Sequence, residues 1–312
     1  MFMADVVLVG IPLDLGAENL GVDMGPNAFR YQHIVEKLTG SGLFVEDVGD
    51  ISCNPRRFLK VGNPKLKYLD EIVRVSEMGA RKTFAIVKKK QKIIVLGGDH
   101  SISLGAVSGA SAAVYGDLGL IYLDAHGDMN TDKTTSTGNI HGMHLSSLMG
   151  FGDKRLTNVY NTSVKIATKN LLHIGGNDLD QSEIELMRKE KLQNFGIFDI
   201  LSNGFAPLFV LIDQLQSQVK NIWVSLDLDV IDCIYAPGAG MPNKAGLSYR
   251  EITAITQYIG EHCNVIGLDI VEYNPLHDAT GKTAELGIEL IAKLLGHTYS
   301  WYTNYLGQNK LK

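Results

Sequence analysis

The stretch LGLIYLDAHGDMN, residues 118–130, decides how the rest of the chain is interpreted. Its first half is apolar without interruption, and its second half carries Asp124, His126 and Asp128 at every other position. Such an apolar run is typical of a strand buried on both faces of a parallel sheet, where ionisable side chains appear only at the strand's end. The solvent face of an edge strand would also show alternating polar residues, but the apolar run argues against exposure. The stretch predicts a metal site at the end of a buried strand.

Similar apolar runs recur along the chain and alternate with segments of helical periodicity, which indicates βαβ units and a mostly parallel sheet. We expect eight strands, near residues 6–11, 44–48, 92–96, 118–123, 171–174, 195–198, 222–226 and 265–271. We expect helices near residues 26–38, 69–89, 101–113, 181–190, 206–219, 249–261 and 282–295. Pro26 suits the first turn of a helix, and Ser248 with Glu251 predicts a capping box. Without a linker or repeat, residues 1–312 form one domain, with residues 298–312 as a C-terminal tail.

The composition indicates which classes of protein and of binding partner are compatible with this chain. The 312 residues are 45% hydrophobic and 20% charged, which is typical of a globular protein and not of a disordered one. A net charge of −5 offers no general attraction for nucleic acid or an anionic membrane. Cys53, Cys233 and Cys263 are too few and too scattered for a disulfide framework or a structural zinc site. We find no signal peptide or membrane span, so we expect a cytoplasmic protein.

Two segments leave alternatives open. Residues 53–67 hold five basic side chains and suggest either an anion-binding loop or a solvated surface loop, of which we favour the second. The aromatic ending, residues 299–306, either packs across a neighbouring subunit or frays.

Two other strand ends resemble the first. GGDHS, residues 97–101, places His100 just beyond a strand, where two glycines permit a sharp turn. Taken alone, such a histidine is more often a capping or packed residue. SLDLDVID, residues 225–232, again places two carboxylates, Asp227 and Asp229, on one side of an extended chain. Buried carboxylates without a partner cost several kcal/mol each, so a cation is expected beside them.

The three strand ends together supply two imidazoles and four carboxylates, a set that suits two metal ions: His100, Asp124, His126, Asp128, Asp227 and Asp229. Oxygen-rich ligands with some imidazole and no thiolate favour manganese, with cobalt, iron or nickel as alternatives, and exclude a thiolate-rich zinc site. Two ions about 3.5 to 4 Å apart can hold one water between them and lower its pKa toward neutrality. The site therefore predicts a hydroxide nucleophile.

At this point the chain resembles a known family, the ureohydrolases, and among them the arginases. The motifs that carry the resemblance are GIPLDLG at 10–16, GVDMGP at 21–26, GGDHS at 97–101, DAHGD at 124–128, SLDLD at 225–229, GLSYRE at 246–251 and GLDIVEYNP at 267–275. The resemblance implies a three-layer α/β/α sandwich around a mostly parallel eight-stranded sheet. It also implies a homo-oligomer, either a trimer or a hexamer.

The resemblance also implies roles for the ligands. One Mn²⁺ would bind His100, Asp124, Asp128 and Asp227, and a second would bind His126, Asp124, Asp227 and Asp229. The implied activity is manganese-dependent hydrolysis of L-arginine to L-ornithine and urea, by attack of a metal-bridging hydroxide on the guanidinium carbon.

Further roles follow from the same resemblance. Glu272 would hold the guanidinium as a charge-assisted partner, and Asp128 would orient the hydroxide. His141, in TGNIHGM at 137–143, is similar to the family's proton-shuttling histidine. Without the resemblance we would interpret His141 as a surface-loop residue.

Substrate choice within the family rests on the loop after the metal motif. Asn130, Thr135, Thr137 and Asn139 suit the carboxylate of an amino acid, and Asp180 and Glu183 suit its α-ammonium. The agmatinase pattern generally lacks this loop, because agmatine has no carboxylate. The alternatives are a sister ureohydrolase, agmatinase or guanidinobutyrase, and a non-catalytic metal-bound protein that binds arginine.

Four residues depart from the family pattern. His144 and Cys233 stand where arginases usually carry proline, Met241 stands where they favour threonine, and Asn177 lies near a position where they favour arginine or a similar residue. None of the four removes a predicted metal ligand.

Overall fold

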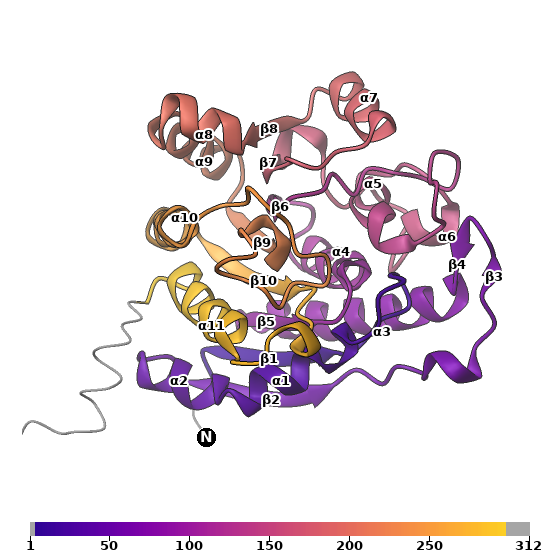
Figure 1. Ribbon diagram of the computed structural model, residues 1–312, viewed down its shortest axis with the longest axis horizontal. Helices are drawn as coiled ribbons and strands as arrows, with labels where there is room; N and C mark the ends of the chain where they lie inside the picture. The colour runs from indigo at the N-terminus through magenta and orange to yellow at the C-terminus, as the bar shows by residue number, and fades with distance from the viewer. Residues whose placement is uncertain (1–3, 298–312) are drawn as a thin grey trace, which may run out of the picture.

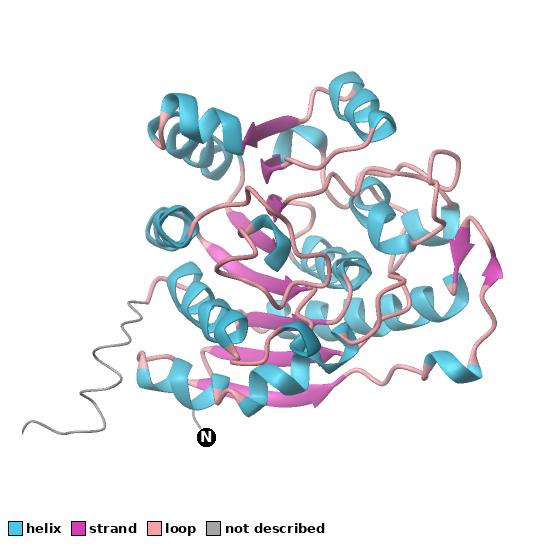
Figure 2. Ribbon diagram, viewed as in Figure 1, coloured by secondary structure: helices cyan, strands magenta, loops and turns pink. Residues whose placement is uncertain are grey.

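A parallel sheet of eight strands forms the centre of the computed structural model, which describes residues 4–297 (Figure 2). The strand order is β2-β1-β5-β10-β9-β6-β7-β8, and every neighbouring pair is parallel. The strands are β1 (Val6–Ile11), β2 (Val45–Asp50), β5 (Lys92–Gly97), β6 (Leu118–Asp124), β7 (Leu171–Gly175), β8 (Gln193–Gly196), β9 (Asn221–Asp227) and β10 (Val265–Val271). A separate hairpin pairs β3 (Gly62–Asn63) with β4 (Leu66–Lys67).

Helices cover both faces of this sheet, because successive side chains of each central strand point into two different apolar cores. In β6, Ile121 and Leu123 join one core, whereas Leu120 and Tyr122 join the other. The first core is closed by α1 (Gly25–Tyr31), α2 (Ile34–Gly40), α8 (Ile197–Asn203), α9 (Ala206–Gln218), α10 (Tyr249–His262) and α11 (Lys282–Leu294). The second is closed by α3 (Leu69–Lys88), α4 (Ser103–Ala113), α5 (His144–Leu148), α6 (Lys154–Thr157) and α7 (Gln181–Lys189). Figure 1 shows the resulting three layers.

The predicted sheet is confirmed, with local corrections. The helix predicted at 26–38 is two helices, because His33 adopts a left-handed backbone conformation with φ 59°. The strand predicted at 195–198 ends at Gly196, because Ile197 already begins α8. The Ser248 capping box is present as predicted. The helices α5, α6 and α8 were not predicted, since four to seven residues are too short to show a period.

The basic segment at residues 53–67 is not simply a solvated loop. Arg56 donates to two backbone carbonyls of a neighbouring loop. Lys65 donates to a carbonyl, and Lys67 to a side-chain amide, within residues 135–139. Lys65 and Lys67 therefore brace the loop that was predicted to bind substrate, whereas Arg56 braces residues 14–17. The predicted behaviour of residues 299–306 lies outside the described residues.

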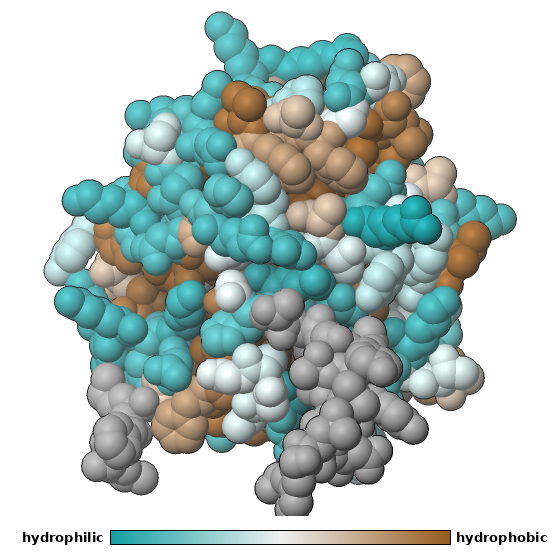
Figure 3. Space-filling view, turned by 90° about the vertical axis from the view of Figure 1, so that its left-hand side faces the viewer, coloured by the Kyte–Doolittle hydropathy of each residue, from teal (hydrophilic) through white to brown (hydrophobic). Residues whose placement is uncertain are grey.

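One face of the molecule carries exposed apolar side chains over α8 and α9. Phe198, Leu201 and Val210 are 79%, 72% and 52% exposed, and Figure 3 shows hydrophobic residues gathered in this upper region. Exposed apolar patches commonly mark contact surfaces. Within residues 4–297, no helix has the length and apolar character needed to cross a membrane.

Candidate metal centre

The candidate site lies where the four central strands end side by side. β5, β10, β9 and β6 are consecutive in the sheet, and they lead respectively into His100, Glu272, Asp227 and Asp124. Parallel strands deliver their carboxyl ends to one edge, so residues far apart in sequence meet there. The predicted convergence of separate strand ends is therefore a consequence of the strand order.

Gly98 fixes the path of the chain between β5 and His100. A Cβ at this position would lie 1.9 Å from the carbonyl oxygen of Leu13, so a larger residue would force the two segments apart. Asp99, next in the chain, accepts hydrogen bonds from the Gly16 and Ser101 amides and starts the 3-10 turn His100–Ile102. The turn aims His100 at the ends of the neighbouring strands.

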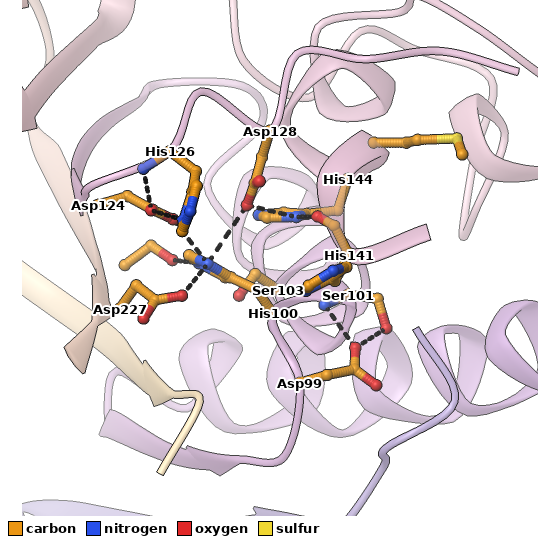
Figure 4. A network of polar contacts seen from close by, with 12 residues as sticks. Asp99, His100, Ser101, Ser103, Asp124, His126, Asp128, His141, His144 and Asp227 are labelled. Atoms are coloured by element: carbon orange, nitrogen blue, oxygen red, sulfur yellow. Dashed lines mark hydrogen bonds and ion pairs between the residues drawn. The ribbon is translucent and has the colours of Figure 1, made fainter. Parts of the chain in front are cut away.

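The first group of ligands is buried around His100 (Figure 4). His100 Nδ1 lies 2.9 Å from Asp124 Oδ2 and 3.0 Å from Asp227 Oδ2. On the other side of the ring, Nε2 lies 2.9 Å from Ser225 Oγ, which donates its own proton to Asp269 at 2.6 Å. Because Ser225 can then only accept from the ring, we infer that Nε2 carries the proton. His100 Nδ1, which faces the carboxylates, is therefore the nitrogen available to a metal ion.

The second group surrounds His126 and opens toward solvent. His126 Nδ1 lies 3.0 Å from Asp229 Oδ2 and 3.5 Å from Asp124 Oδ1, and the His126 side chain is 22% exposed. Asp124 therefore contributes one oxygen to each group. Its Oδ2 is buried without a hydrogen-bond partner although it faces His100, which is the arrangement expected of an atom that binds a cation.

Asp128 lies next to the first group but turns toward a different pair of neighbours. Its Oδ2 is 3.5 Å from His100 Nδ1 and accepts a 2.6 Å hydrogen bond from the Tyr122 hydroxyl. The ligand atoms of His100, Asp128 and His144 lie within 4.8 Å of one another, as do those of His100, Asp124 and Asp227. Asp128 thus lies beside His100, with which the resemblance grouped it, and also beside His144.

The buried carboxylates of this cluster would be stabilised by cations. Burial, together with the charge of Asp124, raises the pKa of Asp128 to about 8, and burial also raises the pKa values of Asp227 and Asp229. Burial opposes ionisation of Asp124 as well, but the neighbouring His100 and His126 side chains hold its pKa well below the usual range. Carboxylates this close repel one another, so a divalent ion would stabilise their ionised forms. The donor set therefore fits divalent metal ions.

A cavity of about 240 Å³ leads from solvent to the cluster. Its lining includes the predicted catalytic and metal-binding residues His126, Asp128, Asp227, Asp229, His141 and Glu272, which we call the floor. It also includes the predicted substrate-binding residues Asn130, Thr135, Thr137, Asn139, Asp180 and Glu183, which we call the mouth. His100 and Asp124 are buried and are not part of the lining. The structure thus gathers the residues predicted separately for catalysis and for substrate binding around one cavity.

Several mouth residues also hold the loop itself in place. Asp180 and Glu183 form a capping box at the start of α7, and Glu183 Oε1 accepts the Met129 amide at 3.1 Å. Asn130 donates to Asp180 at 2.7 Å. Their polar atoms are therefore shared between supporting the loop and facing the cavity.

His141 and Glu272 form a pair at the cavity floor. His141 Nδ1 lies 3.1 Å from Glu272 Oε1, which also accepts the backbone amide of His100 at 2.9 Å. Burial alone would lower the pKa of His141, but its hydrogen bond and ion pair with Glu272 raise that pKa to about 9. Glu272 itself has φ 60°, an uncommon left-handed conformation that directs its carboxylate to this position.

Sequence reasoning missed four polar residues that support the cluster. Ser225 and Asp269 hold His100 from behind, and Tyr122 and His144 flank Asp128. The signal available for Ser225, Asp269 and Tyr122 was a polar atom inside a strand that is otherwise apolar. His144 gave a different signal, as a departure from the family's usual proline.

Comparison with known proteins agrees with this geometry. A model described as the arginase family matches residues 4–296. The arginase of Brevibacillus brevis is 39% identical over 93% of this chain and 97% of its own length. The native structure of the Bacillus caldovelox arginase superposes with a TM-score of 0.91 at 34% identity, covering 96% of this chain and all of that one.

A more distant solved structure, the Entamoeba histolytica arginase in complex with L-ornithine, has a TM-score of 0.84 at 26% identity, covering 95% of this chain and 100% of that one. The family model spans nearly all of the described residues, and the similar proteins are matched over almost their full length. The chain belongs to the arginase family.

Proposed function

We propose that this protein hydrolyses the guanidinium group of L-arginine, giving L-ornithine and urea, with two Mn²⁺ ions bound per subunit. The observation that carries the proposal is the single cavity with a carboxylate-rich floor and an amide- and hydroxyl-rich mouth. A cationic guanidinium suits the floor, and the amino-acid end of the substrate suits the mouth. The similarity to an arginase solved with L-ornithine supports the same substrate class.

The six predicted ligands would hold the ions, His100, Asp124, Asp128 and Asp227 around one and His126, Asp124, Asp227 and Asp229 around the other. When bound, the ions would supply a water molecule activated for attack on a carbon whose delocalised charge makes it a poor electrophile. Cobalt or nickel are the alternative ions.

The chain's own side chains would position the substrate and move its protons. Glu272 would hold the guanidinium against the floor, and Asp128 would accept a hydrogen bond from the attacking oxygen. His141 lines the cavity with a ring that is 20% exposed, so it can exchange protons with solvent and deliver one to the leaving amine.

Recognition of the amino-acid end would belong to the mouth of the cavity. Asn130, Thr135, Thr137 and Asn139 would bind the carboxylate, and Asp180 and Glu183 would meet the α-ammonium. Lys67 Nζ donates a hydrogen bond of 3.1 Å to Asn139 Oδ1. This contact brings a positive charge close to the proposed position of the substrate carboxylate. A substrate without a carboxylate would lose these contacts.

Urea release from arginine, agmatine and guanidinobutyrate, measured side by side with Mn²⁺, Co²⁺ and Ni²⁺, tests the proposal. We expect arginine to be the best substrate. Faster turnover of agmatine or guanidinobutyrate would identify a sister ureohydrolase. Arginine binding without urea release under all three ions would identify a non-catalytic arginine-binding protein.

The expected homo-oligomer, a trimer or hexamer, stays a prediction. The apolar surface over α8 and α9 supports an assembly, because burial of such a surface is favourable. Light scattering on the purified protein measures the molar mass against 34.1 kDa for one chain.

A further inference from the structure

His144 is a histidine buried beside the predicted metal ligand His100. It is the first residue of α5, with φ −70°, a value that proline can also adopt. Its imidazole is completely buried. Its ring centroid lies 4.3 Å from that of His100. A polar ring has therefore been placed directly against a predicted metal ligand.

Hydrogen bonding identifies which nitrogen of His144 is free. His144 Nδ1 lies 2.6 Å from the backbone carbonyl of His141, which can only accept, so Nδ1 carries the proton. Asp128 Oδ2 is a more distant acceptor, 3.5 Å from the same nitrogen. His144 Nε2 must then keep its lone pair.

That lone pair lacks a strong donor. The Tyr122 hydroxyl is 3.3 Å from His144 Nε2, but it is only 2.6 Å from Asp128 Oδ2, to which it donates its single proton. A buried acceptor without a good donor is costly unless a proton or a cation meets it. The buried His144 nitrogen therefore resembles the orphaned Asp124 oxygen on the other side of His100.

The position of His144 is compatible with a shared ion. One ligand atom from each of His100, Asp128 and His144 lies within 4.8 Å of the others. The Tyr122 hydroxyl lies 3.3 Å from both His144 Nε2 and His100 Nδ1, so the free nitrogen of His144 lies near the nitrogen that His100 would offer to an ion. We propose that His144 supplies a second imidazole to the metal position formed by His100 and Asp128, an inference that rests on the two-metal proposal above. Adding nitrogen to an oxygen-rich site shifts its preference from Mn²⁺ toward borderline ions such as Co²⁺.

X-ray absorption spectroscopy of the Co²⁺-loaded protein tests the inference without reference to activity. We expect His100, His126 and His144 to supply three imidazoles for two ions. The variant His144→Phe keeps a buried ring but offers no nitrogen, so two imidazoles should remain. His144→Pro repeats the test in a residue that suits the observed backbone, which guards against misfolding of the phenylalanine variant.

Tyr122→Phe is the matched control. It removes the hydroxyl between His144 and Asp128 but leaves the His144 imidazole in place, so the imidazole count should stay at three. A loss of imidazole scattering in Tyr122→Phe equal to that in His144→Phe would overturn the inference, because the effect would then belong to the hydrogen bonds and not to a ligand.

Competition between Mn²⁺ and Co²⁺ provides an independent measurement of the metal preference. When equal concentrations of both ions compete for metal-free protein, the bound Co²⁺ to Mn²⁺ ratio should fall in either His144 variant, because removal of an imidazole takes away a ligand that favours the borderline ion. If variants that still bind two ions show an unchanged Co²⁺ to Mn²⁺ ratio and an unchanged imidazole count, His144 is not a ligand. The two-metal proposal would still stand in that case. A wild-type protein that binds fewer than two ions would overturn the two-metal proposal as well.

Discussion

The two groups of ligands use the same residue types in different surroundings. Around His100 the side chains are buried, and Ser225 and Asp269 fix the ring from behind. Around His126 the ring borders the cavity, and its outer nitrogen lies 3.7 Å from the exposed Asp178 carboxylate. The two predicted metal positions therefore differ in burial and in the residues behind each ring, although their ligand types are the same. We expect the buried position to bind its ion more tightly and the exposed position to exchange its ion more readily.

The largest effect should come from breaking both groups at once. Asp124→Ala removes one oxygen from each group, so both ions should be lost and urea release should fall by at least about 100-fold. Metal content by atomic emission and a urea assay measure these changes. Asp229→Ala is the matched variant, because it should retain the buried ion while losing most turnover. Two ions retained in Asp124→Ala would contradict the ligand assignment.

A smaller change should weaken only the buried group. Ser225→Ala removes the partner of His100 Nε2, so affinity for the buried ion should fall by about 10- to 100-fold while the exposed position is spared. Ser103→Ala is the control, because Ser103 also donates to Asp269 but does not touch His100 through a hydrogen bond. Titration of metal-free protein with Mn²⁺ resolves the two affinities. Equal losses in both variants would show that Asp269, not the His100 contact, matters.

His141 and Glu272 lie beside the buried group, where Glu272 accepts the His100 amide, and this pair should make stability depend on pH. The folded-state pKa of His141, about 9, is above the ordinary value, so the protonated pair stabilises the fold fully below about pH 6.5. That stabilisation is lost as the pH rises toward and through 9. The free energy of unfolding of the metal-free wild type should therefore fall between pH 6 and pH 9.5. The fall should be about 1 to 3 kcal/mol larger than in metal-free His141→Asn.

Urea denaturation at the two pH values measures this difference. Because other groups of the cluster also titrate, the comparison with His141→Asn isolates the contribution of the pair. Parallel losses in the two proteins would refute the assigned pKa shift.

The smallest effect is expected at the exposed edge of the second group. The Asp178 side chain is 71% exposed and 3.7 Å from His126, so Asp178→Asn should change metal affinity and turnover by less than about threefold. Isothermal titration with Mn²⁺ and the urea assay check both quantities. A loss approaching that of Ser225→Ala would mean that the two environments differ less than their burial indicates.

The sequence predicted the sheet because six of its eight strands are apolar runs that end in recognisable turns or ligands. β1 and β10 have the predicted bounds, whereas β8 was misplaced because Gln193 and Asn194 lack an apolar pattern. The strand ends suggested the ligands of the candidate site, but no sequence pattern gave the strand order that places Glu272 between His100 and Asp227. The contacts of Tyr122 and His144 depend on packing between β6 and α5, which are separated by a long loop. Such contacts carry no local signal.

The position of β10 has a consequence for how the protein is made. β10 is the last strand of the sheet in sequence, yet it lies between β5 and β9, whose ends carry His100 and Asp227. During synthesis, these two residues cannot take up their final separation until residues 265–271 have left the ribosome and inserted between their strands. A nascent chain stalled before this point should bind Mn²⁺ weakly, so the proposed loading with metal would be a late step that follows completion of the sheet.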